Sequence, residues 1–453
     1  MPVYAIADSN LYFLGIHKNE QARTNNIQLE DAWEGGIYHE WGFSHMKRQM
    51  MNVLNRITFN LKPEDNIDFS RNTSNFEVKV LKYEDLDSEL INLWAELEGR
   101  AIESNAYLSP YFILPALKHL TPNTKPIIII IENNEGGNRK LTGVGVFEFT
   151  YGTKKMPLPH LKAYRSTHSF LTGLLIDKNF VEPTITAFFS FFCKQNSNWH
   201  GVEFMDRYRD TELASELDKV ASRVGYTWFN YDMKQRAILI PKENGANFLP
   251  HSRMKDLRRC MKKLSGAGDV QWRIIRSKQG DREPVDVSLK LEHMGWKGAN
   301  GTSLLSERGH EAFFREMIDG FSLSERAFFT ELSLNGEVIA STSNLISGKS
   351  GFAFKVGWNP AFSKMSPGIL NEVEFVNNAV TLFPELDYID SGAEEGSYID
   401  ELWKGRRTLV SGFYATSSIG KKVLSGTDRL RSIKRKLTKL LEFSFARESK
   451  TLK

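Results

Sequence analysis

The sequence predicts an α+β protein, with mixed, mostly antiparallel sheets flanked by helices. Residues 125–132, Lys-Pro-Ile-Ile-Ile-Ile-Ile-Glu, have the length and the β-branching of a fully buried strand. Asn335-Gly336 separates two apolar-rich runs and is typical of a two-residue hairpin turn. Residues 86–103 place apolar side chains at helical spacing instead. Strands joined by short turns therefore alternate with amphipathic helices.

Composition indicates an ordinary globular chain of two or three cores. The chain has 453 residues, of which 41% are hydrophobic and 25% charged. No apolar tract is long enough to span a bilayer, and residues 1–21 lack the pattern of an export signal, so we expect a cytoplasmic protein. Cys193 and Cys260 are too few for a disulfide framework or a four-cysteine zinc site, and both are expected to be small, buried or half-buried side chains. The scattered histidines form no His-x-x-x-His pair, so we expect no metal.

The net charge of +4 is unevenly distributed. Residues 421–453 hold eleven Lys or Arg and three Asp or Glu, which leaves a net charge of −4 on the rest of the chain. The basic character therefore belongs to the tail, and we expect no DNA partner.

The first part of the chain reads as an extension followed by one complete domain. Residues 1–75 keep no steady apolar period, whereas strands and helices alternate from Phe76 onward. After the helix at 86–103 and a turn at 105–112, the expected elements are a short helix to Leu120, strands at 125–132, 141–149 and 170–177, a helix at 184–195, a strand at 201–205, a helix at 211–224 and a final hairpin at 225–239.

The second part repeats this order after a linker at 241–250. A basic helix runs from Ser252 to Leu264, and either contacts phosphates or forms a solvated face, which is the commoner case. The expected elements that follow are a strand at 270–276, helices at 284–294 and 307–320, strands at 327–334, 337–345 and 351–358, a helix at 369–382 and a strand at 386–391. We therefore predict an extension at 1–75, domains at 76–245 and 246–418, and a basic amphipathic tail at 419–453.

Several motifs in this order give the chain a family resemblance. They are Ser109-Pro-Tyr-Phe112, the basic helix, Leu291-Glu-His-Met-Gly-Trp-Lys-Gly298 followed by Gly301-Thr302, Lys355-Val-Gly-Trp358, Ser366-Pro-Gly368, and Asp390-Ser-Gly392 with Trp403 downstream. Residues from about 76 to 417 resemble the acetyltransferases related to the CelD (BioF2-like) proteins, which are tandem GNAT-type folds, and more distantly the FemAB transferases. One departure is that Tyr398 is followed by Ile399, where the family commonly has a Tyr-Lys pair.

The resemblance implies an acyl-CoA co-substrate, acetyl-CoA in the first instance. Ser366, Pro367 and Gly368 would form the turn that holds its pyrophosphate on free N–H groups, and Lys355 and Gly357 would lie on the adjoining strand. The long glycine-rich phosphate loop of ordinary acetyltransferases is absent, so another activated acyl donor stays open.

A general base must remove a proton from the attacking amine. The candidates are Glu292 and Asp390, ahead of Glu394 and His293. Each has a plain structural alternative: a helix-surface charge for Glu292, and a turn residue for Asp390.

The expected substrate-binding residues are Trp296, Lys297, Tyr398 and Trp403, although tryptophans more often belong to a core.

We therefore predict an N-acyltransferase that moves an acyl group from CoA to an amine, such as an amino sugar or a related precursor of a surface polysaccharide. One alternative is a FemAB-like enzyme that takes its acyl group from charged tRNA, and another is a catalytically silent scaffold of a polysaccharide-synthesis complex. The tail could lie on an anionic membrane surface on the inner face, or dock on the body as an ordinary terminal helix.

Overall fold

The computed structural model describes residues 75–120, 125–134, 139–194, 199–242, 249–429 and 431. The predicted extension at 1–75, except for its last residue, and most of the predicted amphipathic tail lie outside these residues. Within the tail, residues 418–429 are helical, and Leu424 is buried. Among the described helices, none is long and apolar enough to cross a membrane.

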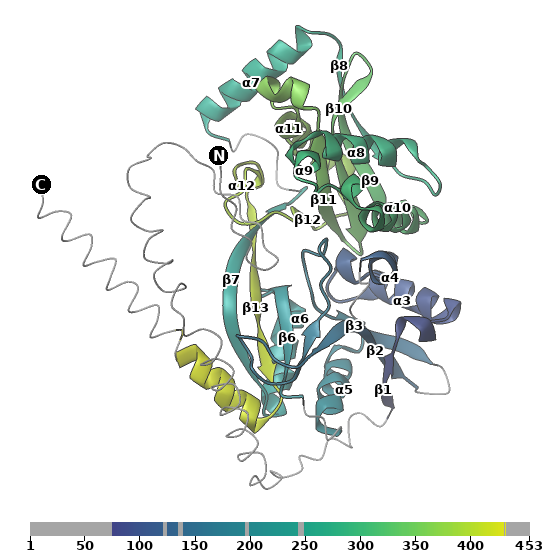
Figure 1. Ribbon diagram of the computed structural model, residues 1–453, viewed down its shortest axis with the longest axis vertical. Helices are drawn as coiled ribbons and strands as arrows, with labels where there is room; N and C mark the ends of the chain where they lie inside the picture. Colours follow the sequence, from purple (N-terminus) through teal and green to yellow (C-terminus); the bar gives the residue numbers. More distant parts are fainter. Residues whose placement is uncertain are drawn as a thin grey trace, which may run out of the picture. The chain divides into compact units, whose positions relative to one another are not determined.

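The first half of the described chain begins with a strand and two helices, followed by an antiparallel set of strands (Figure 1). Its elements are β1 (Phe76–Leu81), α3 (Ser88–Arg100), α4 (Pro110–His119), β2 (Ile127–Asn133), β3 (Lys140–Thr150), β4 (His160–Ala163), β5 (Leu175–Ile176), α5 (Val181–Lys194), β6 (Gly201–Tyr208), α6 (Glu212–Arg223) and β7 (Thr227–Leu239). The strands β1 to β4 pair antiparallel in chain order, and β6 then returns parallel to β4 after helix α5.

The second half repeats this arrangement. Its elements are α7 (His251–Ser265), β8 (Val270–Arg276), α8 (Glu283–Met294), α9 (Trp296–Ala299), α10 (Arg308–Ser322), β9 (Ala327–Leu334), β10 (Glu337–Ser347), β11 (Ser350–Trp358), the 3₁₀ segment η5 (Pro360–Met365), α11 (Pro367–Leu382), β12 (Tyr388–Asp390), α12 (Ile399–Leu402) and β13 (Gly405–Ala415). Strands β8 to β11 pair antiparallel, and β12 returns parallel to β11 after helix α11. The α+β prediction is confirmed.

The two halves form one sheet because they exchange their last strands. The order across the join is β6-β13-β7-β12, so β13 from the second half lies between two strands of the first half, and β7 pairs with β12 of the second. Figure 1 shows β7 and β13 running side by side. The predicted division into domains at 245 and 418 stays a prediction, since β13 belongs to the second half by sequence and is hydrogen-bonded to the first.

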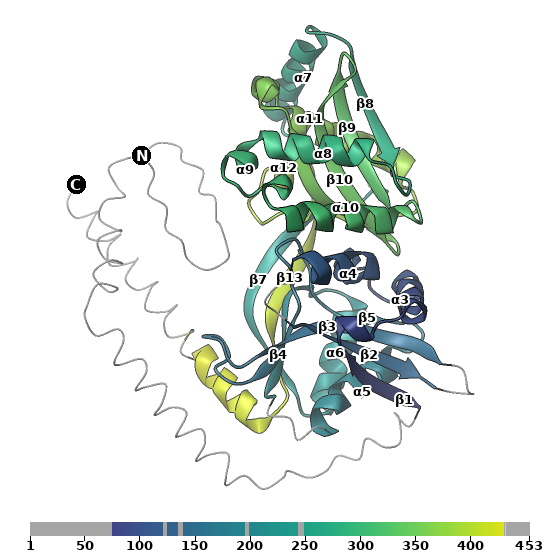
Figure 2. The same ribbon diagram turned by 45° about the vertical axis from the view of Figure 1, so that its right-hand side comes forward.

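A helix from each half adds to this connection. Helices α4 and α10 lie side by side (Figure 2), where Lys118 and His119 both contact Glu316, at 2.9 and 2.7 Å. A Cβ atom on Gly320 would lie 2.9 Å from the Tyr111 ring, so the glycine lets the two helices approach closely. One hydrophobic core includes Phe112 of α4 and Phe313 of α10, which pack edge to face.

Two sequence predictions in the first half are wrong. Residues 225–239 do not form a hairpin, because β7 is a single strand paired with β13 along its length. Within this strand, Asn230 and Asp232 flank a register shift opposite Ser411 and Gly412. Residues 170–177 contribute only the two-residue strand β5, and β4 was not predicted.

Candidate active site

The site lies where β11 and β12 separate. Their parallel pairing covers only Ser350–Phe352 and Tyr388–Asp390, after which β11 continues to Trp358 with no neighbour on that edge among the described strands. On its other edge the register with β10 shifts, since Ala353 and Lys355 face the consecutive residues Asn344 and Ser343. This bulge and the early end of β12 open a gap in the sheet.

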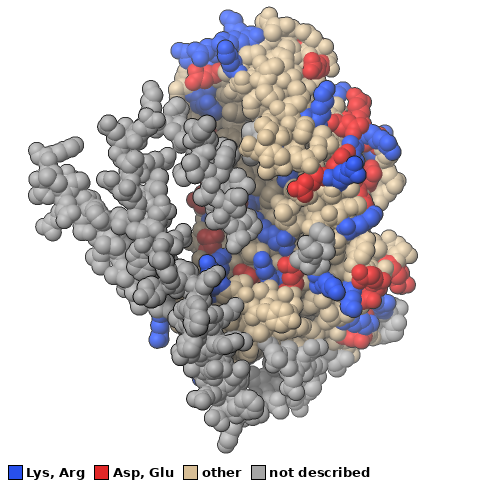
Figure 3. All heavy atoms as spheres, in the orientation of Figure 1, with Lys and Arg blue, Asp and Glu red and all other residues tan. Residues whose placement is uncertain are grey.

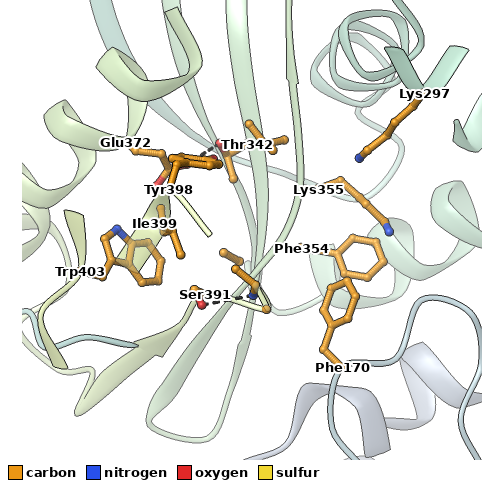
Figure 4. Close-up of a pocket in the computed structure, with 14 residues that line it drawn as sticks. Phe170, Lys297, Thr342, Phe354, Lys355, Glu372, Ser391, Tyr398, Ile399 and Trp403 are labelled. Atoms are coloured by element: carbon orange, nitrogen blue, oxygen red, sulfur yellow. Dashed lines mark hydrogen bonds between the residues drawn. The ribbon is translucent and has the colours of Figure 1, made fainter. Parts of the chain in front are cut away.

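A half-open pocket of about 190 Å³ occupies this gap (Figure 4). Strand β11, helix α11 and the segment after β12 supply most of its lining, and Phe170 comes from the first half. The lining residues are Phe170, Lys297, Thr342, Ala353, Phe354, Lys355, Val356, Glu372, Ser391, Gly392, Ala393, Tyr398, Ile399 and Trp403. The pocket therefore brings together four of the predicted site residues: Lys297, Lys355, Tyr398 and Trp403.

Glu372 is the carboxylate of this pocket, and it was not predicted. It projects from α11, is only 3% exposed, and accepts a hydrogen bond of 2.7 Å from the Thr342 hydroxyl. Its second oxygen, Oε2, is buried without a partner in the described structure. Burial raises the pKa of Glu372 to about 7, although the Thr342 hydrogen bond acts in the opposite direction. A carboxyl group of this kind can accept a proton near neutral pH.

Lys355 lies across the pocket from Glu372. Its Nζ is 3.1 Å from Nδ1 of His168, and it faces the rings of Phe170 and Phe354 at 5.3 and 4.9 Å. Burial, with the nearby charge of Lys297, lowers the pKa of Lys355 to about 7. Burial and the Lys355 charge hold the pKa of His168 well below its usual range. His168 is therefore a neutral imidazole that accepts a hydrogen bond from Lys355.

Glu292, predicted as a base, is already engaged by its own neighbourhood. Its carboxylate is buried at the end of α8, where it pairs with Lys297 at 3.0 Å and accepts a hydrogen bond of 2.8 Å from the backbone N–H of Leu304. Gly357 explains how α8 reaches this place, since a Cβ atom there would lie 2.4 Å from the backbone nitrogen of Glu292. Glu292 thus orients Lys297, which lines the pocket.

Asp390, the other predicted base, holds three elements together. The fully buried carboxylate pairs with Arg236 of β7 at 3.1 Å, and it accepts hydrogen bonds from the Tyr208 hydroxyl at 2.6 Å and the Gly392 N–H at 2.7 Å. Glu394 pairs with Lys234 on the surface, and His293 contacts Ser303. The roles of these four residues as bases stay predictions, and none of the four lines the pocket.

The predicted phosphate turn lies at the start of α11. Ser366 has left-handed backbone angles (φ 51°) and its side chain makes no capping hydrogen bond, while Pro367 occupies the first helical turn. The first intrahelical bond there joins the Leu370 N–H to the Ser366 carbonyl, so the N–H groups of Gly368 and Ile369 point out of the helix start. Such free donors fit a pyrophosphate group. A Cβ atom on Gly368 would lie 3.2 Å from the Trp358 ring, so this glycine also lets α11 pack against the end of β11.

Three of the four predicted substrate-binding residues, Lys297, Tyr398 and Trp403, line the pocket. Tyr398 is 43% exposed at the pocket, and burial of its hydroxyl together with the Glu372 charge raises its pKa. Trp403 is fully buried, and its Nε1 has no partner in the described structure. Trp296 begins α9, and its side chain lies outside the described part.

The basic helix α7 lies against the segment that leads to the phosphate turn. Its Leu257 and Leu264 are buried, and Cys260 is half-buried next to the Lys364 carbonyl of η5. Five of its cations are exposed and form no ion pair with described residues: Lys255, Arg258, Arg259, Lys262 and Lys263. Figure 3 shows blue side chains gathered over this helix at the top of the view.

A family model for acetyltransferase (GNAT) domains matches residues 251–401. This segment is therefore similar to GNAT-type acetyltransferase domains. The matched segment runs from α7 into α12 and therefore holds most of the pocket. The similarity to GNAT acetyltransferase domains is thus to this part of the chain, and the CelD-like resemblance stays an expectation.

Alignments with solved structures cover about three quarters of the chain. FemX is 10% identical to this chain, with a TM-score of 0.47. The alignment covers 75% of this chain and 97% of the FemX chain. The C-terminal domain (DUF2156) of a putative lysylphosphatidylglycerol synthetase from Agrobacterium fabrum is 8% identical, with a TM-score of 0.45, and covers 75% and 96%. A tandem GNAT protein from the clavulanic acid biosynthesis pathway is 12% identical, with a TM-score of 0.36, and covers 76% and 99%. A comparison with curated protein sequences found no match.

Sequence reasoning missed the residues that reach the pocket from distant parts of the chain. His168 and Phe170 belong to the first half, nearly 190 residues before Lys355. One feature of the sequence could have indicated Glu372. It follows Asn371 within a helix whose other inward residues are mostly apolar. A buried Asn-Glu pair in an apolar helix face needs partners, and here these are Thr330 and Thr342.

Proposed function

We propose that this protein transfers an acyl group, acetyl in the first instance, from acyl-CoA to an amine, and that Glu372 is the general base. The observation that carries the proposal is the buried Glu372 carboxylate beside the gap between β11 and β12. The amine nitrogen would form a bond to the thioester carbonyl carbon, the carbon–sulfur bond would break, and the CoA thiolate would leave. The proton of the amine would pass to Oε2 of Glu372, the oxygen without a partner.

Two further features support this reading. Helix α11 supplies both Glu372 and the free N–H groups at its start, so one rigid element would position base and donor. The unpaired edge of β11 lines the pocket, and backbone N–H groups on such an edge can stabilise a developing oxyanion.

The proposed acceptor is an amino sugar or a related precursor of a surface polysaccharide. This part rests on the CelD-like resemblance, and so does the expectation of a cytoplasmic enzyme whose basic tail approaches the inner membrane face.

The proposal is tested by calorimetric titration with acetyl-CoA and longer acyl-CoAs. Gly368→Glu should abolish binding, because its carboxylate would repel the pyrophosphate at the start of α11. Gly99→Glu is a matched control, since Gly99 is exposed on helix α3 and a Cβ atom there meets nothing within 4 Å, and it should bind as the wild type does. If the wild type binds no acyl-CoA, the CoA assignment is refuted.

Helix α7 favours a second candidate, an aminoacyl-tRNA donor. Five exposed cations that pair with no described carboxylate suit a long polyanion better than one nucleotide. The double variant Arg258→Glu/Arg259→Glu should weaken tRNA binding in a filter assay if this donor is used. Under the CoA proposal, the same variant should leave acyl transfer from acetyl-CoA nearly unchanged.

A further inference from the structure

The charged side chains of the pocket lie on two opposite sides. In Figure 4, the ammonium groups of Lys297 and Lys355 lie together on one side, and Glu372 lies with Thr342 and Tyr398 on the other. The two sides come from different elements, β11 with α9 on one and α11 with the segment before α12 on the other. A ligand that fills the pocket therefore meets cations at one end and a carboxyl group at the other.

The cationic side has one more positive group than it has carboxylates. Lys297 pairs with Glu292 at 3.0 Å, whereas Lys355 forms no ion pair with any described carboxylate. The groups that face Lys355 are His168 from the first half, Lys297, and the more distant Glu292. His168 is neutral and offers only a lone pair, and its Nε2 is buried without a partner.

A desolvated lysine without a counter-ion is costly to keep charged. Burial and the Lys297 charge lower the pKa of Lys355 to about 7, so the group is largely neutral at slightly alkaline pH. An anion placed beside it would reverse both effects, because it would supply the missing counter-charge. Lys355 would then be charged, and Lys297 would strengthen the attraction.

The opposite side is suited to an amine. Oε2 of Glu372 has no partner among the described residues and can accept a hydrogen bond from an amine N–H. The Thr342 hydroxyl already holds the other oxygen, which fixes the carboxyl group in one orientation.

From this division we infer that the acceptor is an amine that also carries an anionic group, a carboxylate or a phosphate, and that Lys355 with Lys297 binds this anion while Glu372 receives the amine. The inference rests on the proposed acyl transfer and specifies its acceptor. Neutral amines of the same size should be poor acceptors, because they would gain no electrostatic attraction from Lys355 and Lys297.

The test uses acetylated products, because these have no amine that titrates. They are compared in pairs, in which one member carries the anionic group and the other does not. One pair is N-acetylglucosamine 6-phosphate against N-acetylglucosamine, and the other is N-acetylalanine against N-acetylalaninamide. Calorimetry is run at about pH 8 in two buffers of different ionisation enthalpy, which counts the protons taken up on binding. The two pairs separate a phosphate from a carboxylate.

We expect the anionic member of at least one pair to bind about tenfold or more tightly than its neutral partner. We also expect an uptake of about 0.5 to 1 proton per site, since Lys355 becomes charged when the anion binds. Lys355→Met should remove both the preference and the uptake. Lys355→Arg should keep the preference and lose the uptake, because arginine is already charged.

Three results would each overturn the inference. The members of each pair could bind equally well, the wild type could bind without taking up protons, or no anionic probe could bind at all. The wild-type uptake is informative even if Lys355→Met does not fold. Acyl transfer is followed separately as release of the CoA thiol. Release with neutral and anionic amines alike would refute the inference and leave the proposed function standing, whereas no release with any amine would refute the proposed function.

Discussion

Glu372→Gln should make the protein more stable and less active at the same time. The substitution keeps the shape of the side chain and a hydrogen-bonding partner for Thr342, but it removes the charge. Glu372 is 3% exposed, so solvent screens its charge little.

The magnitude follows from the difference between the folded and unfolded pKa values. The pKa of Glu372 is raised from 4.5 to about 7 in the folded protein. The folded state therefore holds the proton more tightly, and stability is lost as pH rises from about 4.5 to about 7. One pKa unit corresponds to about 1.4 kcal/mol, so the free energy of unfolding of the wild type falls by roughly 3 kcal/mol on going from acid to alkaline pH. Roughly 2.5 kcal/mol of this decrease occurs between about pH 5 and pH 8. Glu372→Gln should not show this loss.

The assay is urea unfolding of both proteins at about pH 5 and pH 8. The stability advantage of Glu372→Gln should grow by about 2.5 kcal/mol over this interval, while kcat/KM for acyl transfer falls by about 10²- to 10⁴-fold. Glu385→Gln replaces an exposed carboxylate just after α11 and is the control. It should change neither the pH dependence of the free energy of unfolding nor kcat/KM. An equal pH dependence in Glu372→Gln and the wild type would show that no buried charge is formed, and full activity would exclude Glu372 as the base.

Three other predictions follow from the site. For the wild type, kcat/KM should fall about tenfold per pH unit as the pH is lowered below about 7, because Glu372 gains a proton, and a flat acid limb would contradict the assignment. Gly357→Ala should lower the free energy of unfolding by about 1–3 kcal/mol, because its Cβ would meet the backbone of Glu292; an unchanged urea midpoint would refute this packing argument. Asp390→Asn should lower it by about 3–5 kcal/mol, because Arg236 would stay buried without its carboxylate, and a loss of activity at unchanged stability would instead support a catalytic Asp390.

Local sequence signals predicted the second half well. The Asn335-Gly336 turn joins β9 to β10, and both residues have positive φ angles, 52° and 82°, as a primed hairpin turn requires. Ser366-Pro367-Gly368 marks the start of α11, because proline suits a first helical turn. Turn and cap chemistry involve neighbours in sequence, and one chain is enough to reveal them.

The active groups of the pocket depend on contacts that sequence spacing does not show. Glu292 and Asp390 stand in conspicuous motifs, yet their contacts are to Lys297 and Arg236 and help to hold the structure together. Glu372 stands in an apolar helix with no motif around it, and its pKa depends on burial by elements far along the chain. Only the packing distinguishes a carboxylate that is already paired from one that is available for a proton.

The exchange of β7 and β13 has a consequence for the order in which the protein can assemble during synthesis. Strand β6 ends at Tyr208, but the strand that pairs with its edge is complete only at Ala415. At ribosomal rates of about 5–20 residues per second, this edge waits roughly 10–40 s for its partner. An unpaired strand edge can join other chains. A nascent chain released before residue 415 would present that edge permanently, so we expect truncated translation products of this protein to aggregate or to be degraded.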